Sequence, residues 1–207
     1  MSDGEALLNP ETLGSSGHLD ASRPARVASG MIRWAWVVLF TLFIYATLPV
    51  GRQAWSWFVG ASRFWSDNIA LAGLVLGGAG IAWLAARRPN PSARSWAIAA
   101  SVAAIYALSL RLLQLTPAEK THFLYYGFLA YLAHRALRQH SAGVALHVAT
   151  IALVAGIGLG DELIQHVLPR RFFEWKDVFL NALSGALALA LVVQFEPEVS
   201  VFRGTDE

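Results

Sequence analysis

Residues 143–166 decide the fold and read GVALHVATIALVAGIGLGDELIQH. From Gly143 to Gly160 the stretch carries no Asp, Glu, Lys or Arg, and it then changes abruptly into a polar end. A helix needs about 20 apolar residues to cross the hydrocarbon core of a bilayer, and this stretch is long enough. It therefore predicts a transmembrane helix with ionisable groups at its C-terminal end.

Five further apolar runs have the same character and are separated by polar connections. The run over 116–137 begins with Thr116-Pro117-Ala118-Glu119, a capping box with proline at the first helical position. The last run follows Asp177, which we expect to be its N-cap. The expected fold class is therefore all-α, a polytopic membrane bundle of about six transmembrane helices. The other helices are expected at 34–50, 69–86, 96–115 and 178–195.

Composition points to the same class of protein. Hydrophobic residues make up 56% of the chain and charged residues only 14%, where soluble domains carry about 25% charged residues. The absence of cysteine excludes disulfides, thiolate metal sites and cysteine nucleophiles. A net charge of +2 is too small for a nucleic-acid-binding surface. The chain is therefore expected to be an integral membrane protein that binds no nucleic acid.

Three regions differ in composition. Residues 1–30 are rich in Ser, Gly and acidic residues, and we expect a disordered tail because they have little apolar surface to bury. Residues 31–196 form the expected bundle, and 197–207 a short C-terminal tail. An inside N-terminus places more Lys and Arg on the inner side, as the positive-inside rule favours, so the N-terminal tail is expected to be cytoplasmic.

Polar residues gather at one end of three predicted helices. The start of 116–137, the end of 143–166 and the start of 178–195 lie on the same side of the membrane in either orientation. With an inside N-terminus, that side is external. Residues three or four apart share a helix face, so the polar groups form stripes that we expect to face a shared cleft. The stripes consist of His122 and Tyr126, of Glu162, Gln165 and His166, and of Asp177, Asn181 and Ser184.

Glu162 is the strongest single signal in these stripes. It lies about 10 Å before the end of its helix at 1.5 Å per residue. A carboxylate that faces lipid at that depth costs on the order of 2–3 kcal/mol. We therefore expect a cationic or donor partner for Glu162, with Arg171, Lys120 and Arg111 as the candidates.

Small residues indicate where helices approach closely. Gly73 and Gly77 form a GxxxG pair, which lets helix backbones pack in lipid. The pair is expected to serve packing within the bundle, and a contact between two copies of the chain is the alternative.

Two blocks of sequence contain most of these polar residues. The first is residues 117–123, PAEKTHF, followed by Tyr126 and Gly127. The second begins at Asp161-Glu162 and continues with Gln165, Pro169, Arg171, Asp177 and Asn181. Both blocks fall within 117–186, and in their residues and intervals they resemble the VanZ-like family of bacterial membrane proteins. The family usually has glycine three residues after the asparagine, where this chain has Ser184 and then Gly185.

The resemblance implies a location and a phenotype. Members of this family are multi-spanning proteins of the bacterial cytoplasmic membrane, and the family is named for a protein associated with resistance to teicoplanin-type glycopeptides. It implies no reaction. The sequence is therefore expected to belong to a protein that affects envelope properties or glycopeptide susceptibility.

The polar stripes support two functional hypotheses. In the first, an external-facing cleft recognises an anionic lipid or lipid-linked cell-wall precursor, with Arg171 and Lys120 meeting the phosphate. In the second, the chain is an intramembrane hydrolase or transferase in which His122 and Glu162 form an acid–base pair. The same groups could instead form a structural clasp between Glu162 and Arg171 or Lys120. The predicted cleft residues are Lys120, His122, Tyr126, Glu162, Gln165, Arg171, Asp177 and Asn181.

No cofactor and no metal site is predicted. His122, Glu162 and His166 include residue types that bind metals, but the sequence has no His-Glu-x-x-His motif. Arg171 and Lys120 would also repel a cation at this end of the bundle.

Overall fold

Six helices account for nearly all of the described chain. The computed structural model describes residues 23–61, 63–87, 90–169 and 171–195, and these residues contain no strand. This all-helical architecture confirms the predicted fold class. In chain order the helices are α1 (Arg23–Ala61), α2 (Arg63–Ala86), α3 (Ala93–Leu112), α4 (Pro117–Leu137), α5 (Gly143–Val167) and α6 (Trp175–Phe195).

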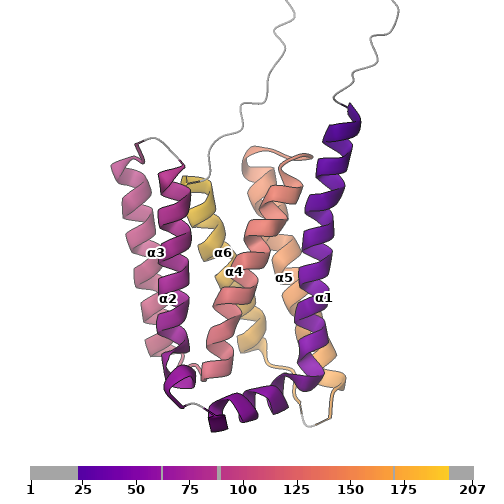
Figure 1. The fold of residues 1–207 in the computed structure, drawn as a ribbon, viewed down its shortest axis with the longest axis vertical. Helices are drawn as coiled ribbons and strands as arrows, with labels where there is room; N and C mark the ends of the chain where they lie inside the picture. The colour runs from indigo at the N-terminus through magenta and orange to yellow at the C-terminus, as the bar shows by residue number, and fades with distance from the viewer. Residues whose placement is uncertain (1–22, 62, 88–89, 170, 196–207) are drawn as a thin grey trace, which may run out of the picture.

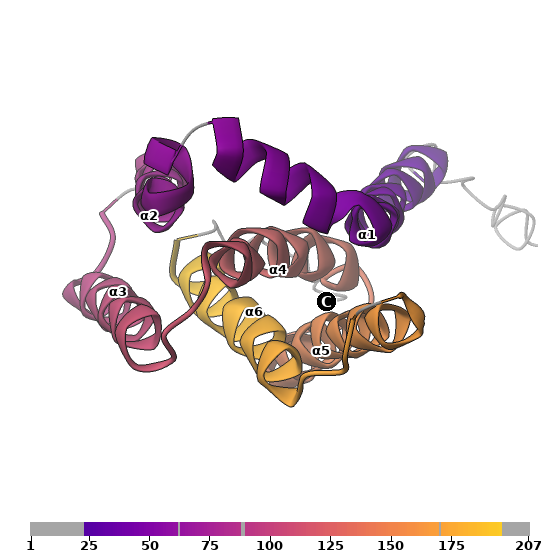
Figure 2. The same cartoon turned by 90° about the horizontal axis from the view of Figure 1, so that it is seen from below.

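Helix α4 occupies the centre of the bundle. Seen along the helices, it lies between α1 on one side and α5 and α6 on the other (Figure 2). It packs against α1, α2, α5 and α6, whereas α3 packs against α6. This position gives the polar residues of α4 protein neighbours, which lowers the cost of placing them among apolar helices.

Among the described residues, four helices are long and apolar enough to cross a membrane on their own. They are α1 over Ala28–Pro49, α3, α5 and α6. Helix α4 carries the charged residues Glu119, Lys120 and Arg135, and it is not apolar enough to be identified as a membrane span in the same way. The chain is therefore a membrane protein in which the least apolar helix is the most enclosed one.

Helix α1 differs from its prediction at both ends. It begins at Arg23, so the described residues before 31 are helical, whereas residues 1–22 and 197–207 lie outside the described part of the chain. It also continues past the predicted end at Val50 to Ala61, with Pro49 inside. Proline removes a backbone donor and kinks a helix without having to end it. After the bend, α1 runs across the lower end of the bundle (Figure 1).

The other boundaries follow from local capping. Helix α4 begins as predicted, because Thr116 and Glu119 form both hydrogen bonds of the capping box. Helix α3 ends at Leu112 rather than Leu115, and Gln114 adopts a left-handed conformation at φ 47°. Helix α6 begins at Trp175, so Asp177 lies within its first turn and is not the predicted N-cap.

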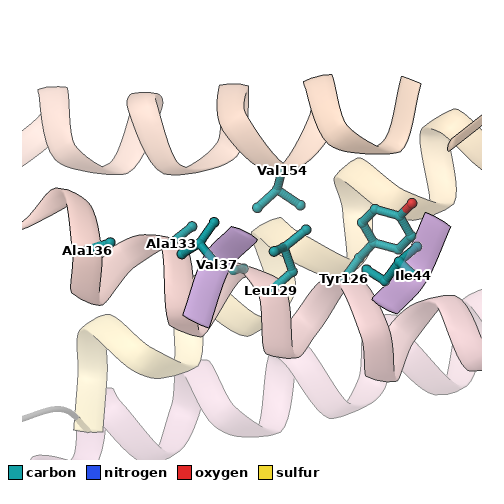
Figure 3. Close-up of a cluster of buried hydrophobic side chains, with 8 residues drawn as sticks. Val37, Ile44, Tyr126, Leu129, Ala133, Ala136 and Val154 are labelled. Atoms are coloured by element: carbon teal, nitrogen blue, oxygen red, sulfur yellow. The ribbon is translucent and has the colours of Figure 1, made fainter. Parts of the chain in front are cut away.

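The buried apolar core lies where α1, α4 and α5 meet. Tyr126, Leu129 and two alanines of α4 point between Val37 and Ile44 of α1 and Val154 of α5 (Figure 3). Ala133 and Ala136 are fully buried and leave room for the neighbouring helices to approach. Small side chains at such contacts are typical of helix packing in lipid.

Glycines set the close approach of α5 and α6. A Cβ atom on Gly158 would lie 2.7 Å from Cβ of Asn181, and one on Gly185 would lie 2.7 Å from Cγ1 of Val154. Of the predicted GxxxG pair, Gly73 packs against Tyr106 and Leu124 within the bundle, which is the expected use. Gly77 has open space at its Cβ position. A contact between two copies stays a prediction.

The Gly158 contact makes a direct test of this packing. Gly158→Ala should lower the melting temperature of the purified protein, because overpacking a close helix contact costs about 1–3 kcal/mol. Gly156→Ala is the matched control on the same helix, because a Cβ atom at Gly156 would have no neighbouring atom within 4 Å. Equal melting temperatures for the two variants would contradict the close approach of α5 and α6.

Candidate functional site

The polar stripes meet at one end of the bundle. The start of α4, the end of α5 and the start of α6 lie together at the lower end in Figure 1. The connection from α5 to α6 crosses the same end. All contacts described below lie there.

Tyr126 and Asp161 form the hydrogen bond that joins α4 to α5. The Tyr126 hydroxyl donates to Oδ2 of Asp161 at 2.8 Å, and the two residues are 1% and 2% exposed. Asp161 was not among the predicted cleft residues. Its spacing of four residues from Gln165 and its place beside Glu162 are the signals that could have identified it.

Gln165 connects the polar groups of α5. Its amide nitrogen lies 3.3 Å from Oδ1 of Asp161 and 3.1 Å from Oε1 of Glu162. Its carbonyl oxygen accepts a hydrogen bond from Nη1 of Arg171 at 2.9 Å. One side chain thus links two buried carboxyl groups to a guanidinium.

Glu162 finds donors other than the expected cations. The second oxygen of its carboxyl group, Oε2, accepts the backbone N–H of Glu174 at 3.0 Å. Among the described residues, Arg171 reaches Glu162 only through Gln165. The predicted clasp between Glu162 and a cation is therefore replaced by a network in which Gln165 is the intermediate.

Helix α6 contributes two polar residues that face the network. The Asn181 amide donates to the backbone oxygen of Gly158 at 3.5 Å and is fully buried. Asp177 lies one turn nearer the helix start, and one of its carboxylate oxygens lies within 4.8 Å of an oxygen of Glu174. Ser184 instead donates to the Leu180 carbonyl of its own helix.

The cations at this end have different partners from those predicted. Lys176 forms an ion pair with Glu119 and so ties the start of α6 to the start of α4. Sequence reasoning assigned Glu119 only to the capping box, although it serves both contacts. Lys120 is half-buried, and Arg111 and His166 are exposed.

His122 lies beside Tyr126. Its ring meets the edge of the Tyr126 ring with centroids 6.0 Å apart. The described contacts of Glu162 do not include His122, so the proposed acid–base pair is not in direct contact.

Three buried polar atoms here have no hydrogen-bond partner among the described residues. They are Nδ1 of His122, Oδ1 of Asp177 and Oδ1 of Asn181. An unpaired buried polar group costs about 1–3 kcal/mol, so native structures usually supply a partner, which can be water or a ligand.

A group of carboxylates lies at the outer edge of the network. Glu119, Glu174 and Asp177 each offer an oxygen, and these oxygens lie within 4.8 Å of one another. The Lys176 ammonium already pairs with Glu119 in this group. The prediction that the chain holds no metal stays a prediction.

The family comparison covers the whole of this site. The profile of the VanZ/LLP1 family matches residues 31–196, most of the chain, so the chain belongs to this family and the suspected resemblance is confirmed. No curated protein and no solved structure matches the chain.

Proposed function

Because the chain belongs to the VanZ/LLP1 family and its polar groups converge at one end of a membrane bundle, we propose that it recognises an anionic lipid or lipid-linked envelope group there. The phosphate would meet Arg171 and Lys120. The carboxyl and amide groups of Glu162, Gln165, Asp177 and Asn181 would orient the rest of the head group.

The position of Arg171 is the observation that carries this proposal. A guanidinium has five N–H donors, and the described contacts of Arg171 use a single one, to Gln165. The network holds this half-buried side chain in place without pairing it to a carboxylate. Arginine in such a position is suited to bidentate contact with a phosphate.

The carboxylates of the network do not compete for Arg171. Asp161 and Glu162 accept hydrogen bonds from Tyr126, Gln165 and the Glu174 backbone, and Glu119 pairs with Lys176. The positive charge of Arg171 is thus left for an anion from outside the described chain.

The proposal extends to location and phenotype. We place the protein in the bacterial cytoplasmic membrane with its N-terminus inside and the network on the external side. Lipid recognition there would alter the envelope, and with it susceptibility to teicoplanin-type glycopeptides. The charge distribution supports this orientation, since the described side chains at the opposite end include Arg33, Arg94, Arg135 and Arg138 and no carboxylate.

Native mass spectrometry on gently extracted protein tests the lipid contact. Wild-type protein should retain a defined lipid with a phosphate in its head group, and Arg171→Ala should retain about tenfold less, because one charge-assisted contact of about 1.4 kcal/mol corresponds to a factor of ten. Arg111→Ala removes an exposed arginine of α3 and serves as the control. Equal lipid retention in wild type and Arg171→Ala would refute the proposal.

Cysteine labelling tests the orientation, because the chain has no cysteine of its own. Phe172→Cys lies in the connection from α5 to α6 and should react with an impermeant maleimide in intact cells. Ser141→Cys, in the connection from α4 to α5, should react only after permeabilisation. The reverse pattern would place the network on the cytoplasmic side.

A further inference from the structure

Unpaired acceptor atoms line the inner side of the network. Asp177 and Asn181 are four residues apart and share a face of α6. The Asn181 amide nitrogen reaches Gly158, so this face turns toward α5. Asn181 is completely buried, with 0% of its surface exposed to solvent, yet its Oδ1 has no hydrogen-bond partner among the described residues.

The chemistry of these atoms defines what they can bind. A carboxylate oxygen and an amide oxygen only accept hydrogen bonds, so the missing partner must be a donor. Nδ1 of His122, unpaired on the facing helix α4, can accept or donate according to its protonation. A bare phosphate offers no donor when it is fully ionised, and it would meet repulsion from Asp177.

The local charge favours a cationic donor over a neutral one. Glu119, Glu174 and Asp177 bring three carboxylates within 4.8 Å, and Lys176 is the described ion-pair partner of Glu119. Three acidic groups against one paired ammonium leave this edge of the site negative. A protonated amine satisfies both the charge and the unpaired oxygens, whereas a hydroxyl satisfies only the oxygens.

Arg171 and Asp177 belong to one continuous site. Arg171 connects through Gln165 to Glu162, and Glu162 accepts the backbone N–H of Glu174. A carboxylate oxygen of Glu174 in turn lies within 4.8 Å of one of Asp177. An anion-binding group and an amine-binding group therefore flank the same buried network.

We propose that the head group recognised at this site carries a protonated amine next to its phosphate, with the amine held by Asp177 and Asn181 and the phosphate by Arg171. This inference rests on the phosphate contact of the proposed function and changes the class of its ligand from a net anionic head group to a zwitterionic one, in which the amine balances the charge of the phosphate. An ethanolamine phosphate is the simplest head group with this pairing of charges.

Binding of three lipids with identical acyl chains tests the inference. Phosphatidylethanolamine, phosphatidylcholine and phosphatidylglycerol would each be titrated into the delipidated full chain in detergent and bound lipid counted by native mass spectrometry. Phosphatidylcholine has a quaternary amine without N–H donors, and phosphatidylglycerol has hydroxyl donors without positive charge. Phosphatidylethanolamine should bind about tenfold more tightly than either, since charge-assisted hydrogen bonds are the stronger kind.

Two variants connect this preference to the named residues. Asp177→Asn keeps the size of the side chain and should abolish the preference for phosphatidylethanolamine. Glu174→Gln alters an exposed side chain, leaves its backbone contact with Glu162 intact, and should reduce the preference in part. A preference that is unchanged in both folded variants would overturn the inference.

The outcomes separate this inference from the function on which it rests. Equal binding of the three lipids, or tighter binding of phosphatidylglycerol, would overturn the amine site while Arg171→Ala still weakened all three. If Arg171→Ala left the binding of all three lipids unchanged, the proposed function itself would be refuted.

Discussion

The structure depends on placing two adjacent acidic residues of an apolar helix away from lipid. Asp161 and Glu162 are 2% and 1% exposed near the end of α5, where little water is at hand to solvate them. One donor to these groups is Gln165 of α5 itself, and the other two come from elsewhere in the chain: the Tyr126 hydroxyl of α4 and the backbone of Glu174 before α6. Because each donor must arrive from a different direction, satisfying α5 fixes how α4 and α6 meet it.

The remaining packing is arranged around that constraint. Helix α4 lies at the centre, so its polar start contacts protein, and alanines on its core face allow α1 and α5 to come close. Gly158 and Gly185 remove the side chains that would hold α5 and α6 apart. Lys176 and Glu119 join α6 to α4 at the outer edge. The network therefore leaves Arg171 and the face of Asp177 and Asn181 positioned at one end of the bundle, which is where ligand recognition is proposed.

Most of the fold could be predicted from periodicity and capping, because lipid leaves a helix few alternatives. The six helices, the capping box at Thr116 and the family follow from the residues themselves. The continuation of α1 through Pro49 to Ala61 was not predicted, because proline can end a helix or only kink it. The predicted start of α6 at residue 178 was wrong, because Asp177 was interpreted as the N-cap, whereas the helix begins at Trp175.

The sequence predicted which residues lie in the candidate site better than it predicted which of them contact one another. Helical spacing placed Tyr126, Glu162, Gln165 and Asn181 on converging faces, and all are buried there. Spacing could not show that Gln165 would connect Glu162 to Arg171, or that Lys176 would take Glu119. Such pairings depend on helix rotation and on loop geometry, which no single helix encodes.

A double-mutant cycle between Tyr126→Phe and Asp161→Ala tests the central claim most directly. Unfolding free energies of the wild type, both single variants and the double variant would be measured in the same detergent, with Tyr125→Phe as the neighbouring control. If the buried network joins α4 to α5, the two changes should couple by about 0.5–3 kcal/mol. Strictly additive effects, with Tyr126→Phe no more destabilising than Tyr125→Phe, would show that this hydrogen bond does not hold the helices together.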